Sequence, residues 1–183
     1  MISDNLIIIK HQIESSLKKS GRKSDSCTLI GVSKTKPLSQ IKEAFNSGLR
    51  DFGENYVEEF SSKHNEYNPE ELNYHFIGRL PTKKVRKIVG NADLIHSVSS
   101  LKLAKKISEE QNKIKKRLKI FIQINIGNEE QKNGIDESNL NEFYNSCVND
   151  LDLDIIGLMC LPPKENESKK FFLKMKNLAE NLN

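Results

Sequence analysis

The sequence predicts an α/β fold on a parallel sheet, of the β/α-barrel type. A helix at about residues 3–20 precedes six strand–helix units over about residues 28–182, an alternation typical of parallel sheets with right-handed crossovers. An open doubly wound sheet competes with the barrel, but when it binds nucleotides it usually carries a glycine-rich first turn, and residues 33–37 have none. Polar or glycine residues recur at the strand ends, which favours the barrel.

The length predicts one domain over residues 1–183 with a sizeable core. A complete (β/α)8 barrel usually takes ~200 residues or more. We therefore expect an incomplete barrel with six β/α units and an N-terminal helix.

The first helix has apolar residues at helical spacing, with Ser3 as the expected cap and Gly21 at its end. Its apolar positions are Leu6, Ile9, Ile13 and Leu17. A short apolar strand follows at residues 28–32, and Pro37 stops it because proline has no N–H and favours the start of a helix.

The later elements follow from the same two patterns, alternation for strands and a 3.6-residue period for helices. Strands are expected at residues 50–53, 73–78, 93–98, 118–126 and 153–159. Helices are expected to hold Ile41 and Ala44, Val57 and Phe60, residues 81–89, Leu101 and Ile107, Leu140 and Phe143, and Phe171 to Leu182. Ser99 or Ser100 is expected to cap the helix that holds Leu101 and Ile107.

The charge of the chain does not indicate a nucleic-acid-binding protein. The net charge is +4, which alone does not indicate nucleic-acid binding. Basic runs, at residues 83–87 and 113–119, lack the interleaved aromatic residues of a base-stacking surface, so they are interpreted as solvated faces and no nucleic acid is expected.

The cysteines, Cys27, Cys147 and Cys160, are odd in number and far apart. This argues against a disulfide framework and a zinc site, so no metal is expected. No signal peptide or membrane-spanning run is evident, and the sequence predicts a cytoplasmic protein with no membrane partner.

Lys34 is the leading candidate for chemistry because it follows the first strand directly. In α/β proteins the carboxyl ends of the strands bind ligands. A lysine held there partly out of water can form a Schiff base with a carbonyl group. The alternative is a solvated surface lysine, because the chain has 29 lysine and arginine residues.

Five segments in order make the chain resemble the pyridoxal phosphate homeostasis protein family, the single-domain relatives of the alanine racemase N-terminal barrel. They are Val-Ser-Lys-Thr-Lys-Pro at 32–37, Phe-Gly-Glu-Asn-Tyr at 52–56, His-Phe-Ile-Gly at 75–78, Gln-Ile-Asn-Ile at 123–126 and Gly-Leu-Met at 157–159. The resemblance covers essentially the whole chain. It implies pyridoxal 5'-phosphate as the cofactor, bound as a Schiff base on Lys34.

The resemblance also implies further cofactor contacts at the strand ends, namely Asn55, His75, Phe76, Ser97 and Met159. Three of these have simpler interpretations from the residues alone. Asn55 is also a suitable helix cap, His75 a packed histidine and Met159 a core side chain. Lys36 is interpreted as a solvated or phosphate-attracting charge.

The chain departs from the family in two places. Pro81 and Lys83 stand where the family usually has amide residues, whereas Lys84 keeps its place. The seventh and eighth strands of the family barrel have no counterpart in this sequence, although barrels typically bind phosphate on the loops after those strands.

The resemblance favours a protein that holds and supplies the cofactor, with no catalytic residues of its own. Acceptor apo-enzymes are possible partners, and a monomer or weak dimer is expected. One alternative is a racemase or decarboxylase that needs a partner domain, because such catalysis requires a second acid/base. Another is a truncated chain that has lost cofactor binding.

Overall fold

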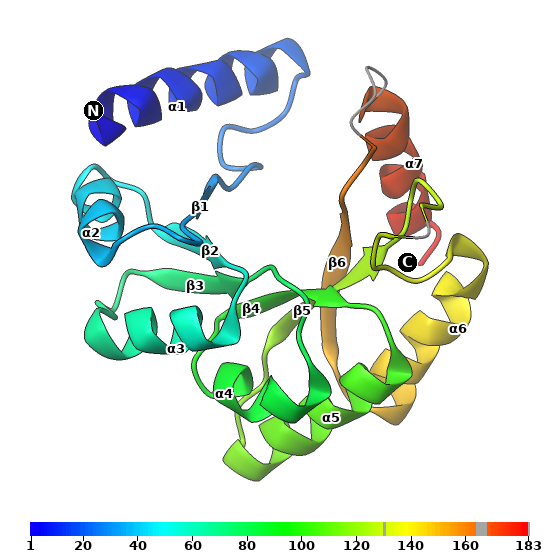
Figure 1. Cartoon of the computed structure of the whole chain (residues 1–183). Helices are drawn as coiled ribbons and strands as arrows, with labels where there is room; N and C mark the ends of the chain where they lie inside the picture. The colour runs from blue at the N-terminus through cyan, green and yellow to red at the C-terminus, as the bar shows by residue number, and fades with distance from the viewer. Residues whose placement is uncertain (130, 164–167, 183) are drawn as a thin grey trace. The chain divides into compact units, whose positions relative to one another are not determined.

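The computed structural model describes residues 1–129, 131–163 and 168–182 (Figure 1). Six strands form one sheet in the order in which they occur along the chain. They are β1 (Ile30–Val32), β2 (Asp51–Glu54), β3 (Asn73–Phe76), β4 (Leu94–Val98), β5 (Lys119–Ile124) and β6 (Asp154–Cys160). This sequential order confirms the barrel-type arrangement, because a doubly wound sheet reverses its order at a switch point.

Helices alternate with the strands as the sequence predicts. The α-helices are α1 (Ile2–Lys19), α2 (Leu38–Asn46), α3 (Val57–Glu66), α4 (Val85–Val89), α5 (Leu101–Ile114), α6 (Leu140–Asn145) and α7 (Ser168–Glu180). Short helical turns η1 (Thr82–Lys84), η2 (Glu137–Asn139) and η3 (Ser146–Asp150) adjoin α4 and α6. Among the described residues no helix is both long and apolar enough to cross a membrane.

The chain divides into two compact units, residues 1–75 and 76–183. The prediction of a single domain stays a prediction. In the first unit β1 and β2 pair in parallel, so that Gly31 faces the same side as Phe52 and Val32 the same side as Gly53. Buried side chains of α2 and α3, among them Ile41 and Phe60, supply the core of this unit.

The N-cap residues of α1 and α5 can be compared with the sequence prediction. Met1, not Ser3, is the N-cap residue of α1, and no side chain caps that helix, so the predicted Ser3 cap is wrong. Ser100, rather than Ser99, caps α5, because its hydroxyl oxygen accepts a hydrogen bond from the Leu103 amide at 3.3 Å.

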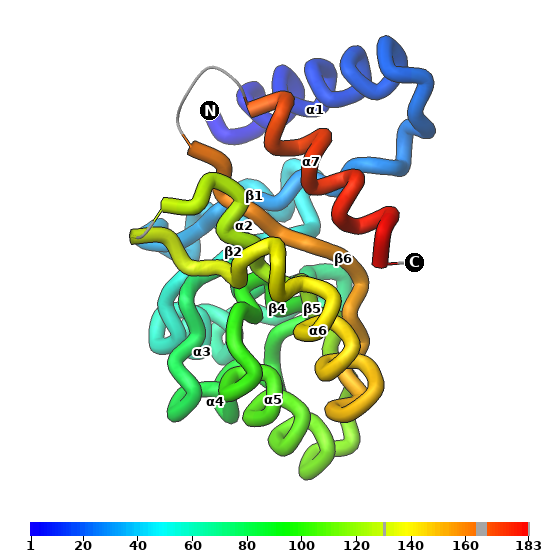
Figure 2. The backbone as a smooth tube through the Cα atoms, turned by 90° about the vertical axis from the view of Figure 1, so that its right-hand side faces the viewer, coloured from blue at the N-terminus to red at the C-terminus, as the bar shows by residue number. Residues whose placement is uncertain are grey.

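The second unit contains η1 and α4, followed by β4, α5, β5, η2, α6, η3, β6 and α7 (Figure 2). Strands β4, β5 and β6 pair in parallel. Alternate residues of β5, namely Ile120, Ile122 and Ile124, are almost completely buried. The other residues of β5, Lys119, Phe121 and Gln123, lie on the opposite face of the sheet, and two of them are polar.

Candidate functional site

Lys34 lies in the turn between β1 and α2. Ser33 extends the strand pairing by donating its N–H to the Gly53 carbonyl at 3.0 Å, and Pro37 stands directly before α2. The side chain of Lys34 is exposed, and its ammonium group makes no hydrogen bond or ion pair with any residue that the structure describes. Its position at the carboxyl end of the first strand agrees with the sequence prediction.

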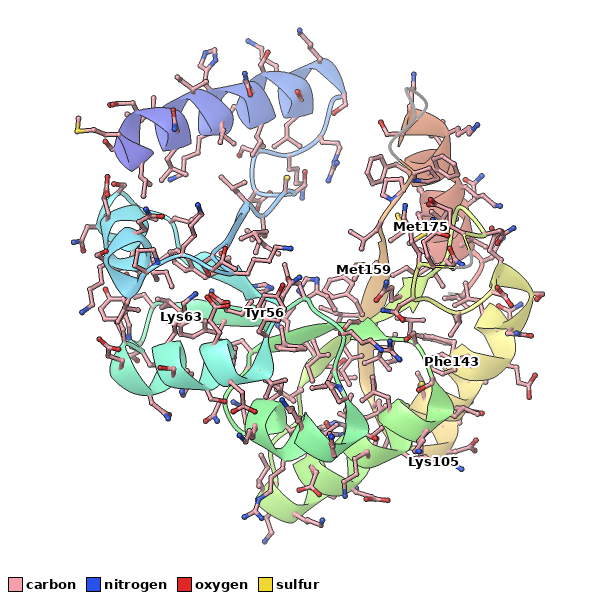
Figure 3. All side chains as sticks on the ribbon, viewed as in Figure 1. Tyr56, Lys63, Lys105, Phe143, Met159 and Met175 are labelled. Atoms are coloured by element: carbon pink, nitrogen blue, oxygen red, sulfur yellow. The ribbon has the colours of Figure 1, made fainter. Side chains whose placement is uncertain are left out.

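A polar cluster joins this turn to β2 and α3, and we call it the Lys63 cluster: Ser33, Thr35, Glu54, Glu59 and Lys63. Ser33, Glu54 and Lys63 are buried, Glu59 is partly exposed and Thr35 is exposed. The Lys63 ammonium group donates to the Ser33 carbonyl and to one carboxylate oxygen each of Glu54 and Glu59, all at 2.7 Å. Lys63 is 7% exposed and Glu54 is fully buried. In Figure 3 the Lys63 side chain extends from α3 towards the strands.

The Lys63 cluster also fixes both neighbours of Lys34. The Ser33 hydroxyl donates to the same Glu54 oxygen at 2.7 Å, and the Thr35 amide donates to Glu59 at 2.6 Å. Thr35 has a φ of 62°, which is unfavourable for a β-branched residue. The backbone on each side of Lys34 is therefore held by side chains of β2 and α3.

The negative charge of this region affects a neighbouring phenol. Burial and, secondarily, the carboxylate of Glu54 raise the pKa of Tyr74 above its ordinary value. Tyr74 packs edge-to-face on Phe60 of α3, and its hydroxyl donates to the Tyr67 carbonyl at 2.9 Å. Tyr74 thus stays neutral and contributes to packing.

Asn55 and His75 have different surroundings in the first unit. Asn55 is half-buried and follows β2 directly; no side chain caps α3, whose N-cap residue is Tyr56, so the alternative that Asn55 caps this helix is wrong. His75 is 4% exposed, and its Nε2 lies 2.9 Å from a carboxylate oxygen of Asp51. His75 is therefore a packed, hydrogen-bonded histidine, and a contact with the cofactor ring stays a prediction.

Phe76 is fully buried at the end of β3. Side chains alternate along a strand, so Phe76 lies on the same side as Tyr74 and on the opposite side from His75. The packing of Tyr74 on Phe60 identifies this as the side that faces α3. Phe76 therefore packs on the side of α3, and a contact between Phe76 and the cofactor stays a prediction.

In the second unit a mixed aromatic and polar surface covers the sheet face opposite the isoleucines of β5. The register pairs Phe121 with Gly157 and Gln123 with Met159. His96 of β4 stacks on Phe121, with ring centroids 4.7 Å apart, and the Gln123 amide donates to the Asn133 carbonyl at 2.9 Å. Met159, labelled on β6 in Figure 3, is partly exposed rather than a core side chain.

Ser97 occupies an irregular point of β4. The register shifts between Ile95 and Val98, so that two residues of β4 lie opposite one residue of β5. Ser97 is 3% exposed, and its hydroxyl oxygen has no hydrogen-bond partner within the described part of the chain. A buried hydroxyl without a partner calls for an explanation, and a bound polar group is one.

Every lysine and arginine of the basic runs at residues 83–87 and 113–119 is exposed except Lys84, which is partly exposed. Arg117 forms an ion pair with Asp152 at 2.5 Å, and the Lys116 ammonium group lies 3.4 Å from the carbonyl oxygens of Gly90 and Ala92. In the described ranges no group of three or more His, Cys, Asp or Glu side chains could hold a metal ion.

Sequence reasoning did not identify the roles of Glu54, Glu59 and Lys63. The signal was present in the spacing of α3, where Val57, Phe60 and Lys63 are all buried and follow each other at intervals of three residues. A lysine on the apolar face of a helix needs a partner. Glu59, four residues before Lys63, is the partner that the helical spacing predicts.

Comparison with known proteins gives consistent results. The family model "Alanine racemase, N-terminal domain" matches residues 7–182. The chain is 33% identical to a pyridoxal phosphate homeostasis protein of Aquifex aeolicus over 182 residues, covering 98% of this chain and 80% of that protein. It is 34% identical to the protein of the same description from Escherichia coli, covering 97% and 77% respectively.

Solved structures show the same similarity. PipY of Synechococcus elongatus, solved with pyridoxal phosphate bound, has a TM-score of 0.83 and 29% identity, over 100% of this chain and 82% of that chain. Alanine racemase from Bartonella henselae has a TM-score of 0.73 and 14% identity, over 100% of this chain and 49% of that chain, which shows a shared fold only. Both structures support the barrel-type fold.

Proposed function

Because this chain belongs to the pyridoxal phosphate homeostasis protein family, with the fold of the alanine racemase N-terminal domain, we propose that it binds pyridoxal 5'-phosphate through Lys34. The observation that carries the proposal is the exposed Lys34 side chain, which has no partner among the described residues while the backbone on both sides of it is fixed. A lysine side chain without a partner, on a backbone that is held in place, suits reversible bonding to an aldehyde.

The bond proposed is a Schiff base. The Lys34 ammonium group first loses a proton, its nitrogen adds to the aldehyde carbon, a C=N bond replaces the C=O bond, and water leaves. Asn55 at the end of β2, in the same unit as Lys34, supplies a half-buried amide. An amide suits a ligand that has a ring nitrogen, a hydroxyl and a phosphate to be hydrogen-bonded. A contact with Ser97 stays a prediction.

Reduction with borohydride tests the proposal directly. The purified chain, mixed with pyridoxal phosphate, should show the visible band of a Schiff base, and reduction followed by peptide mapping should place one adduct on Lys34. Lys34→Ala should lose the adduct. Lys36→Ala, in the same turn, is the matched control and should keep it. Low adduct levels spread over many lysines would contradict the proposal and favour a chain that has lost cofactor binding.

We further propose that the bound cofactor is held for transfer rather than used in catalysis, as the names of the relatives suggest. The loaded protein should restore activity to an apo-enzyme that requires pyridoxal phosphate, faster than the same total amount of free cofactor at low concentration. Racemisation or decarboxylation of an amino acid by the loaded protein alone would instead support the enzyme alternative. The identity of the acceptor enzymes and a monomer or weak dimer stay predictions.

A cytoplasmic location is part of this proposal. Its support is that Cys27, Cys147 and Cys160 are all free thiols, which suits a reducing compartment.

A further inference from the structure

Lys63 uses all three of its ammonium hydrogens within the Lys63 cluster. Its acceptors are the Ser33 carbonyl, Glu54 and Glu59, each at 2.7 Å. A lysine that is 7% exposed is uncommon, because removing an ammonium group from water is costly unless it is paired. An apolar side chain at this position of α3 would continue the buried stripe of Val57 and Phe60 without that cost.

The contacts of the Lys63 cluster converge on the two peptide units that flank Lys34. On one side, Lys63 holds the Ser33 carbonyl and Glu54 holds the Ser33 hydroxyl. On the other side, Glu59, itself bonded to Lys63, accepts the Thr35 amide hydrogen at 2.6 Å. The backbone position from which the Lys34 side chain projects is therefore held by Lys63 and its two carboxylate partners.

The turn also needs such a restraint. The φ of 62° at Thr35 is a left-handed conformation that a β-branched residue rarely adopts and that persists only where the surroundings enforce it. Without the acceptor on Glu59 and the cation that orients it, the turn would relax to other conformations. Lys34 would then lose its fixed position at the end of β1.

We propose that Lys63 is a positioning residue for Lys34: through Glu54 and Glu59 it holds the strained turn that presents the Lys34 amine to an aldehyde ligand. This inference rests on the proposed function, since it concerns the efficiency with which Lys34 forms its Schiff base. It differs from a purely structural role, in which loss of Lys63 would lower stability and leave the geometry of the turn and the bonding of folded molecules unchanged.

The first experiment compares Lys63→Met with Lys106→Met. Lys106 is a matched control because it also bridges two carboxylates, Glu109 and Glu110, but lies on α5 in the second unit. In the protein without cofactor, amide hydrogen exchange at Thr35 should be about tenfold or more faster in Lys63→Met and unchanged in Lys106→Met, because only the former removes the restraint. Unchanged exchange at Thr35 in a folded Lys63→Met would overturn the proposal.

The second readout is the Schiff base itself. For folded Lys63→Met, pyridoxal phosphate should bind about tenfold more weakly, equivalent to ~1.4 kcal/mol, with an altered pH dependence of the visible band. Lys106→Met should match the original protein in both respects. If the original protein forms no adduct on Lys34, the proposed function fails, whereas adduct formation unaffected by Lys63→Met overturns the positioning role alone.

A second pair of variants applies if Lys63→Met does not fold. Glu59→Gln keeps an oxygen that can accept the Thr35 amide hydrogen, whereas Glu59→Ala removes it. Glu59 is partly exposed, so both variants should fold. Glu59→Gln should bind pyridoxal phosphate within about threefold of the original protein and Glu59→Ala about tenfold more weakly. Equal affinities for the two variants would contradict the proposal.

Discussion

Gly134 shows how strongly one residue can be constrained by its backbone. Its φ is 139°, and a Cβ atom added there would lie 2.3 Å from the Asn125 amide nitrogen. Gly134→Ala should therefore lower the free energy of unfolding by about 2–3 kcal/mol, through both the strained conformation and the overlap. Gly90→Ala is the control, because a Cβ there meets nothing within 4 Å. Urea denaturation of both variants tests this, and equal midpoints would contradict it.

Single residues also mark the limit of what the sequence predicted about the site. Lys34 was identifiable because a strand, a lysine and a proline follow each other directly in the chain. For Lys63 the sequence showed only its place on the apolar face of α3 and Glu59 four residues before it. Its other partners, Ser33 and Glu54, are 30 and 9 residues away, and only folding brings them together. Phe76 was assigned to the site by its motif, whereas strand alternation places it on the side of Tyr74.

Among the secondary-structure elements, α5 offers a test of helix capping. The sequence left Ser99 and Ser100 as alternatives, and the structure assigns the cap to Ser100. Ser100→Ala should lower the free energy of unfolding by about 1 kcal/mol, because the Leu103 amide loses its acceptor. Ser99→Ala should change it by less than about 0.5 kcal/mol. Thermal or urea unfolding measures both, and a larger loss for Ser99→Ala would reverse the assignment.

The order and type of the elements were predictable because each strand and helix has its own local pattern of apolar residues. Their ends were less so. The strand expected at residues 118–126 ends at Ile124, because Asn125 accepts the Glu129 amide hydrogen and donates to the Glu129 carbonyl, which turns the chain. Such side-chain contacts with the backbone of a later turn have no periodic signal in the sequence.

For the whole molecule, the fold was predictable from the alternation of strands and helices, whereas the choice of barrel over open sheet depended on strand ends and on resemblance. The sequential strand order confirms that choice. The surroundings of side chains such as His96 and Gln123 were not predictable, because they arise only from pairing with neighbouring strands.

Ligand-induced stabilisation tests the proposed site on the intact chain. A ligand that binds only the folded protein adds about 2.7 kcal/mol of stability at a hundred times its Kd, which should raise the Tm by about 5–10 °C for a chain of this size. Schiff bases on scattered surface lysines would form in the unfolded chain as well and would add little. Pyridoxal phosphate should therefore raise the Tm of the original protein and not that of Lys34→Ala. Pyridoxine phosphate, with an alcohol in place of the aldehyde, should raise the Tm of the original protein much less. Equal Tm shifts with pyridoxal phosphate in the original protein and in Lys34→Ala would show that Lys34 does not hold the cofactor.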